Sequence, residues 1–191
     1  MGVSEQSLET AFLNNGIRYV TEARDLKDAL TKIVAAAAAT VGSECGSLYL
    51  LQSDGNLEPY ILHNFPDDYL VGCKTVPLGT QCCGRAALHK VPWIVEDMWT
   101  DPLFVDCREA AKKAGMRSAI SVPVLMADGR CVGTLASQFK EIYRPTEYSI
   151  ERHRLFAQLI AFAIARDLEQ TKRKPAKSAE YIAASGQIAS D

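Results

Sequence analysis

Cysteines are the residues of this sequence best suited to covalent chemistry. Cys82 and Cys83 lie between Gly79 and Gly84, and Cys107 follows them further along the chain. A thiol at a helix N-terminus has a lowered pKa and becomes a nucleophile. A nucleophilic thiolate can reduce a sulfoxide when a second cysteine condenses with the sulfenic acid that forms. These cysteines therefore fit a thiol switch or a thiol-dependent redox enzyme, and the alternative is that they are small buried apolar side chains.

The cysteines and histidines do not have the spacing of a metal site. No Cys-x-x-Cys pair occurs, and His63, His89 and His153 are scattered along the chain. A structural zinc ion needs four closely grouped Cys or His ligands. A haem iron needs an axial ligand, which His63 and His89 offer only by residue type. We therefore expect no metal and no haem.

A second group of residues has the character of a small-molecule site. Such sites combine aromatic and apolar side chains with a few polar groups. Members of this group fall on the exit of a predicted hairpin, on a crossover segment and on the strand after it. The predicted ligand-binding residues are His63, Phe65, Tyr69, Trp93, Asp97, Trp99, Phe104, Cys107, Met116, Arg117 and Ser121. For Arg117 we expect an internal ion pair with Asp97 or Asp101 before a contact with an anionic ligand, and for each apolar residue the alternative is ordinary core.

Apolar periodicity predicts helices at both ends of the chain. Residues 1–42 are predicted to form two helices, the second capped by Asp25 and ended by Gly42. A long helix is predicted over residues 145–170. Residues 171–191 are basic, then small and polar, without periodicity, and they predict a flexible tail.

Between the end helices the sequence predicts hairpins joined by helical crossovers. Asp54-Gly55 and the turn 127–130 each lie between two apolar segments, which is typical of β-hairpins. The predicted strands are 45–52, 57–63, 73–78, 92–97, 117–126 and 131–139, and the predicted short helices are 85–90 and 106–114. This order favours an α/β (α+β) fold with a central antiparallel sheet of five to six strands. The N- and C-terminal helices would pack on one face and a ligand pocket would lie on the other.

Composition narrows the classes of function. The chain has 191 residues, is 48% hydrophobic and carries 21 Lys and Arg against 23 Asp and Glu, for a net charge of −2. This balance gives no support to binding of nucleic acid or of an anionic membrane surface. No apolar run approaches the ~20 residues that span a bilayer. The N-terminus lacks the basic and apolar regions of a signal peptide, so we expect a cytoplasmic protein.

The ordered set of motifs resembles the GAF domain family over residues 45–168. The motifs are GTQCCGRAA (79–87) followed by VPWIVEDMWTDP (91–102), then AKKAGMRSAISVPV (111–124), then DGRCVGTLASQF (128–139). The resemblance implies one GAF/PAS-like domain over residues 1–170, with residues 45–139 as the sheet and crossovers. It also implies a non-catalytic sensor of a small molecule, a homodimer formed through the terminal helices, and a histidine kinase or other signalling output as partner. We expect no cofactor, and the sequence does not name the ligand.

An enzymatic alternative comes from the same family. Free methionine-(R)-sulfoxide reductases are GAF proteins, and residues 83–86 are similar to one of their conserved segments. Cys107 lies at the offset of their catalytic cysteine, so the alternative catalytic set is Cys107, Cys83 and Cys82. Arg108, however, follows Cys107 where those enzymes have Asp, and Ser118-Ala119 stands where they have Ser-Glu. Both substrate-binding carboxylates are missing, so the sensor remains the preferred interpretation.

A tetrapyrrole photosensor is a further alternative. Cys107 resembles in position the cysteine that anchors a bilin in cyanobacterial GAF photoreceptors. Those receptors have a histidine immediately after that cysteine, and here the residue is Arg108. We therefore expect no bilin.

Overall fold

The computed structural model describes residues 15–66, 69 and 74–173 of the 191-residue chain. The strands are β1 (Cys45–Leu51), β2 (Asn56–His63), β3 (Val76–Pro77), β4 (Trp93–Val95), β5 (Ser118–Leu125) and β6 (Cys131–Phe139). The helices are α2 (Leu26–Thr40), α4 (Gln81–His89), the 3-10 helix η1 (Pro102–Cys107), α5 (Arg108–Lys113) and α6 (Glu147–Arg173). Residues 15–21 are also helical.

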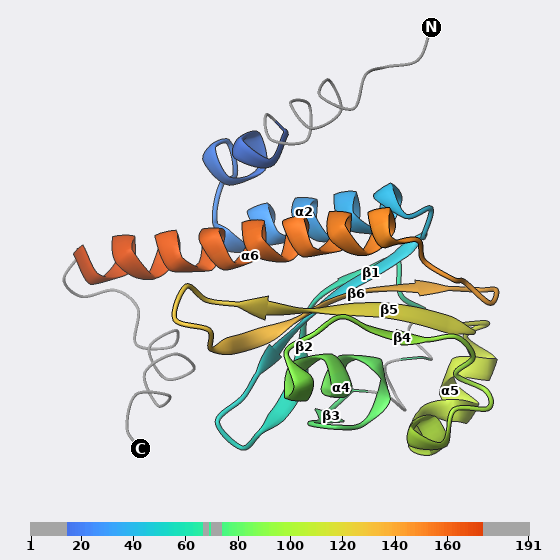
Figure 1. Cartoon of the computed structure of the whole chain (residues 1–191). Coiled ribbons are helices and arrows are strands. Elements are labelled where there is room, and N and C mark those ends of the chain that lie inside the picture. The colour runs from blue at the N-terminus through green and yellow to red at the C-terminus, as the bar shows by residue number, and fades with distance from the viewer. Residues whose placement is uncertain (1–14, 67–68, 70–73, 174–191) are drawn as a thin grey trace, which may run out of the picture.

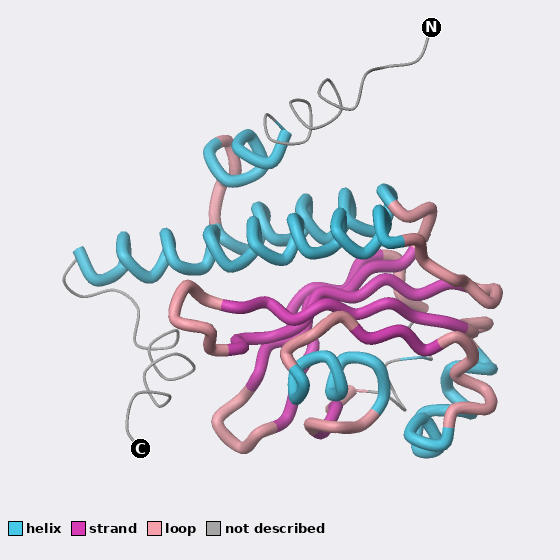
Figure 2. The backbone as a smooth tube through the Cα atoms, in the orientation of Figure 1, coloured by secondary structure: helices cyan, strands magenta, loops and turns pink. Residues whose placement is uncertain are grey.

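The six strands form one antiparallel sheet in the order β3-β2-β1-β6-β5-β4. Figures 1 and 2 show this sheet as a curled middle layer, with α2 and α6 side by side along one face and α4 and α5 on the other side. The predicted α+β fold with a central antiparallel sheet is therefore confirmed. Both predicted hairpins, β1–β2 and β5–β6, are present.

Side-chain alternation gives the sheet two different faces. Leu48 of β1, Leu135 of β6 and Val122 of β5 are neighbours across the central pairings and are fully buried. They belong to the main hydrophobic core together with residues of α2 and α6. A register shift of one residue would turn these side chains away from the helices, so the apolar set fixes the register of the central strands.

Helix α2 begins and ends where the sequence predicts. The N–H of Asp28 donates to Oδ1 of the N-cap Asp25 at 2.8 Å, and Gly42 follows the helix with a φ of 73°. The helix approaches the sheet closely at Gly46, where an added Cβ would lie 3.0 Å from Cγ1 of Val34. The missing side chain at this position therefore lets α2 lie against β1.

The short elements differ from their predicted boundaries. Helix α4 begins at Gln81, before the predicted start at residue 85, and it includes Gly84. An added Cβ at Gly84 would lie 2.1 Å from the carbonyl oxygen of Pro77, so this glycine permits close approach of α4 to β3 and does not end a turn. The predicted helix 106–114 is wrong as a single element, because η1 precedes α5 there.

Two further predicted elements, the strand 73–78 and the helix 145–170, begin earlier than the observed ones. The predicted strand 73–78 is reduced to β3, and Cys73 lies outside the described residues. Helix α6 begins at Glu147 because Oγ1 of Thr146 accepts from the N–H of Ser149 at 3.2 Å, which caps the first turn.

Helix α6 extends to Arg173, past the predicted end at residue 170. The predicted tail beyond residue 173, and the part of the predicted first helix before residue 15, lie outside the described residues. Within the described ranges, no helix is both long and apolar enough to cross a membrane.

A histidine is buried between α6 and the sheet. His153 is fully buried, and its Nε2 lies 2.9 Å from Oγ of Ser137 on β6. Burial lowers the pKa of His153 to about 4 from the usual 6.5, while the backbone carbonyl of Ser149 offsets part of that effect. The imidazole is therefore neutral at physiological pH.

Acidification is expected to destabilise the protein through His153. The unfolded chain takes up a proton below about pH 6.5, whereas the folded protein does so only near pH 4. Stability that is present above pH 6.5 is therefore lost as the pH falls toward 4, by roughly 3 kcal/mol. Urea denaturation at several pH values measures this loss. The pH dependence should shrink in His153→Leu and persist in the control His89→Leu, whose histidine is exposed.

Candidate functional site

A small hollow lies on the face of the sheet opposite α2 and α6. Its volume is about 20 Å³, which is enough for one water molecule. Side chains from β1, β5 and β6 form its floor, and α4, η1 and the segments beside them cover it. The lining residues are Tyr49, Tyr69, Val76, Gln81, Cys82, Cys83, Met98, Phe104, Ala119 and Gln138.

A larger but more open cavity lies at one end of the sheet. It has a volume of about 300 Å³ and is lined by residues 42–45 and 138–143. Its wall includes the exposed ion pair of Glu44 with Lys140 and the stacked rings of Phe139 and Tyr143, whose centroids are 3.9 Å apart. None of the predicted site residues lines it. We place the candidate site at the smaller hollow because its polar groups are buried and therefore need partners.

Two glutamines give the hollow its polar character. Gln138 is 6% exposed; its Nε2 donates to Oγ of Ser47 at 3.3 Å, and its Oε1 is buried without a hydrogen-bond partner among the described residues. Gln81 is 8% exposed, and its Nε2 donates to Sγ of Cys107 at 3.0 Å. An unsatisfied buried acceptor is costly, so Gln138 Oε1 is the group of this site that most needs a donor.

Neither glutamine was among the residues predicted from the sequence. For Gln138 a signal did exist, because residues 134, 136 and 138 alternate with Leu135 on β6 and share the face opposite α6. A large polar side chain at the end of such an inward row, in a buried strand, indicates a functional position. For Gln81 there was no comparable signal, since its position depends on a backbone φ of 49° at the start of α4.

Four of the predicted ligand-binding residues form a separate cluster on the crossover. Nη2 of Arg117 lies 3.1 Å from Oδ2 of Asp97, which confirms the expected internal ion pair. The Arg117 guanidinium also lies 4.7 Å from the centre of the Trp99 ring, and Nε1 of Trp99 donates to the Met116 carbonyl at 2.9 Å. Burial raises the pKa of Asp97, but hydrogen bonds from Arg117 and from the Trp99 backbone outweigh this and hold it below its usual value. None of the four lines the hollow.

The remaining predicted residues divide between the hollow and its surroundings. Tyr69 and Phe104 line it, and the Phe65 ring lies 5.3 Å from that of Tyr69. Nε2 of His63 lies 3.2 Å from Nδ2 of Asn64.

The other three lie close to helix α4. The Trp93 ring stacks on that of His89 at 5.1 Å. The hydroxyl of Ser121 lies beside the thiol of Cys83, and the thiol of Cys107 accepts the hydrogen bond from Gln81.

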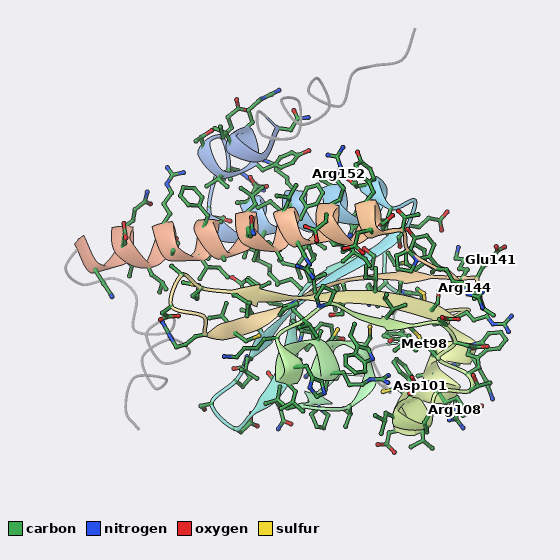
Figure 3. All side chains as sticks on the ribbon, viewed as in Figure 1. Met98, Asp101, Arg108, Glu141, Arg144 and Arg152 are labelled. Carbon is green, nitrogen blue, oxygen red and sulfur yellow. The ribbon has the colours of Figure 1, made fainter. Side chains whose placement is uncertain are left out.

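A buried ion pair holds the loop before η1 against α4. Arg85 is 7% exposed, its Nη2 lies 2.9 Å from Oδ2 of Asp101, and its Nε donates to the Gln81 carbonyl. Asp101 also accepts from the N–H of Leu103 at 2.8 Å. Figure 3 shows Met98, Asp101 and Arg108 together below the sheet, and Nη2 of Arg108 donates to the Asp101 carbonyl at 2.9 Å. This network fixes the segment that carries Phe104 over the hollow.

The cysteines near the hollow are not activated thiols. Burial raises the pKa of Cys82 well above its usual value, and the neighbouring Cys83 raises it further. Burial also raises the pKa of Cys83, against a smaller opposing effect of the Thr134 and Ser121 hydroxyls. The prediction of a lowered thiol pKa at the start of α4 is therefore wrong, because desolvation outweighs the helix N-terminus. Cys82 instead donates to the Trp93 carbonyl at 3.3 Å.

No metal-binding constellation was found in the described part of the chain. There, no group of three or more His, Cys, Asp and Glu side chains is placed to hold an ion. The polar side chains that line the hollow carry amides, phenolic hydroxyls and thiols. This donor set suits hydrogen bonds and apolar contacts with an organic molecule.

The fold and this site define the class of protein, an α+β domain with a six-stranded antiparallel sheet and a covered polar hollow on one face. The GAF domain family matches residues 23–165. The chain belongs to that family.

The chain is also similar to particular proteins. It is 29% identical over 89 residues to a methyl sulfide methyltransferase-associated sensor of Methanosarcina acetivorans, and this match covers 47% of the chain but only 9% of that sensor. A domain of a two-component sensor histidine kinase protein from Sinorhizobium meliloti matches 81% of the chain and 100% of its own length, with TM-score 0.68 and 16% identity. Free methionine-R-sulfoxide reductase from Neisseria meningitidis matches 89% of the chain and 96% of its own length, with TM-score 0.70 and 20% identity. At these identities the two structures support the fold alone.

Removing Asp101 is expected to destabilise the protein strongly. Asp101→Ala leaves the Arg85 cation buried without its counter-ion, and breaking such a pair costs about 3–5 kcal/mol. Urea denaturation measures the difference. The control Asp128→Ala removes the half-exposed pair with Arg130 and should cost less than about 1 kcal/mol. Similar losses in both variants would contradict the assigned role of the buried pair.

Alkylation should distinguish the thiols by burial. Cys82 and Cys83 are expected to react with iodoacetamide far more slowly than the half-buried Cys131, because they are buried and neutral at physiological pH. Peptide mass mapping after timed labelling measures each site, and labelling in denaturant provides the control in which all sites react. Rapid native labelling of Cys82 or Cys83 would show that one of them is an activated thiol after all.

Proposed function

We propose that this chain is a non-catalytic sensory domain that binds a small organic molecule in the hollow beneath α4 and η1. The buried and unpartnered Oε1 of Gln138 is the observation that carries this proposal. Membership of the GAF family and the match to a protein named as a sensor support it. The free cysteines of the described residues fit a reducing compartment, for which we propose the cytoplasm.

The sheet offers a physical route from the hollow to the end helices. Tyr49 and Ala136 contact the hollow side, while Leu48 and Leu135, their neighbours in sequence, pack under α2 and α6. An occupant larger than water has to move Phe104 or Met98, or shift the strands beneath it. A shift of the strands changes the surface on which α6 packs, so the bound and free states favour different helix positions. A histidine kinase or another signalling output is the proposed reader of that change.

A second copy of the chain is the proposed partner of α6. Tyr148, Leu155 and Phe162 are 53%, 39% and 59% exposed and recur every seven residues, so they lie on one side of the helix. Such a stripe is typical of a helix that pairs with another helix. Residues 15–21 contact the same side of α6, where an added Cβ at Gly16 would lie 3.1 Å from Leu159, so a second copy would pair with α6 beside this short helix.

The geometry favours binding over sulfoxide reduction. Cys107 is 2% exposed and accepts a hydrogen bond from an amide. Cys82 and Cys83 are held as neutral thiols by burial. No carboxylate lines the hollow within the described residues. A reductase needs a reachable thiolate and groups that bind the amino acid.

Native mass spectrometry of freshly purified protein tests the proposal. We expect a non-covalent adduct that is released under denaturing conditions. The adduct should be lost in Ala119→Met, which fills the hollow, and kept in the control Ala127→Met, whose side chain is exposed. A thioredoxin-coupled assay with free methionine-R-sulfoxide should show no turnover. Turnover that disappears in Cys107→Ser and survives in Cys131→Ser would replace the sensor by an enzyme.

The oligomeric state tests the role of α6. Wild-type protein is expected to be a dimer, and Phe162→Glu a monomer, because it places a charge in the middle of the apolar stripe. Thr31→Glu introduces the same charge on the exposed side of α2 and should leave the dimer intact. Sedimentation velocity at several concentrations measures both. A wild-type monomer would rule out this interface.

A further inference from the structure

Gln138 gives the hollow a defined hydrogen-bonding direction. Its Nε2 donates to Oγ of Ser47 at 3.3 Å, and Oε1 is its remaining polar atom. The residue is 94% buried, and it lines both this hollow and the larger cavity at the end of the sheet. A donor that enters the hollow satisfies a buried acceptor of this kind.

The same wall carries no charge that a ligand could pair with. No described side chain that lines the hollow is ionised at neutral pH. Among the described residues, the buried cation is Arg85. Its guanidinium pairs with Asp101, donates to the Gln81 carbonyl and lies 5.4 Å from the Trp93 ring centre. Moving an ion from water into such a site without a counter-ion is strongly unfavourable. The wall therefore selects against both anions and cations.

Apolar side chains line the hollow beside the polar groups of Gln81, Tyr49 and Tyr69. Phe104 and Met98 are fully or almost fully buried and come from the crossover segments, whereas Ala119 comes from the sheet floor. Aromatic rings and a thioether form favourable contacts with a flat or compact apolar body. Because Phe104 and Met98 do not belong to the sheet, they can move aside without breaking strand pairing.

We propose that Gln138 is the specificity-determining residue of this site, and that the site takes a neutral, compact, largely apolar ligand which donates one N–H or O–H group to Gln138 Oε1. This inference rests on the proposed function and names its ligand class. A ligand that only accepts hydrogen bonds leaves Oε1 unpaired and binds more weakly. An ionised ligand of the same size is excluded.

Four five-membered rings of similar size separate these possibilities. Pyrrole donates one N–H, thiophene has no donor, tetrahydrofuran only accepts, and pyrrolidine is a cation at neutral pH. Amide chemical shifts of the full chain, followed by NMR during titration with each ring, give the affinities and show whether residues 81–83, 104 and 136–138 respond. Pyrrole is expected to bind about tenfold more tightly than thiophene or tetrahydrofuran, and pyrrolidine should not bind.

Variants assign the preference to Gln138. Gln138→Met keeps the length of the side chain and removes the amide. The variant should therefore bind pyrrole and thiophene with about equal affinity. Ser47→Ala removes the partner of Nε2 and leaves Oε1 in place, so it should keep the preference. Gln158→Met, on the exposed side of α6, should bind as the wild type does.

The outcomes separate this inference from the proposed function. Equal binding of pyrrole and thiophene at the hollow, or a preference for tetrahydrofuran, overturns the role of Gln138 and leaves a binding domain. A preference that persists in Gln138→Met overturns it equally. Absence of binding by every ring, together with no copurified adduct in the native mass spectrum, overturns both.

Discussion

The pairing of β1 with β6 is the constraint on which the remaining structure depends. It joins residues 45–50 to residues 133–138 at the centre of the sheet, and each strand brings its own hairpin partner with it. The approach is close, since an added Cβ at Gly133 would lie 2.2 Å from the carbonyl oxygen of Tyr49. Once this pairing is in register, alternation sends Leu48 and Leu135 to the helices and Ala136 and Gln138 to the other face. The apolar core and the polar hollow therefore lie on opposite faces of this one pair of strands.

The two faces are stabilised in different ways. The helix face is largely apolar, and it includes the pair of His153 with Ser137, whose imidazole is held neutral by burial. The other face is covered by short elements, and the buried pair of Arg85 with Asp101 ties α4 to the loop before η1. A buried ion pair specifies geometry more than it adds stability. Here it holds α4 and the loop before η1 in one arrangement above the hollow.

Burial also decides the chemistry of the thiols. A helix N-terminus lowers a thiol pKa by up to a few units only when the thiol remains near water. Cys82 and Cys83 lie at the start of α4, but their side chains face the sheet, where desolvation raises the pKa of both. The position of these cysteines at the start of the helix predicts a lowered thiol pKa, but the burial of their side chains against the sheet raises it. The same groups consequently serve as neutral walls of the hollow.

Much of the fold could be predicted because its signals are local. Asp25 caps α2, Asp54-Gly55 turns the first hairpin, and the alternation along β5 and β6 assigns their two faces, all from neighbouring residues. An internal ion pair of Arg117 with Asp97 or Asp101 was also expected, and the structure shows that Asp97 is the partner. The start of α4 did not, because Gly84 resembles a turn glycine until the contact with Pro77 is known.

The sequence by itself determined the family, the sheet and the two end helices, because hydrophobic period, caps and turns act over a few residues. Only the tertiary structure decided which of the polar residues meet. Gln81 and Gln138, which are far apart in the chain, both line one hollow together with Phe104. A separate cluster on the crossover contains Asp97, Trp99, Met116 and Arg117. The physical reason is that the hollow is the space left between the strands, helix α4 and the buried ion pair once these have packed. The distances between these elements depend on contacts between residues far apart in the chain, which no local sequence pattern predicts.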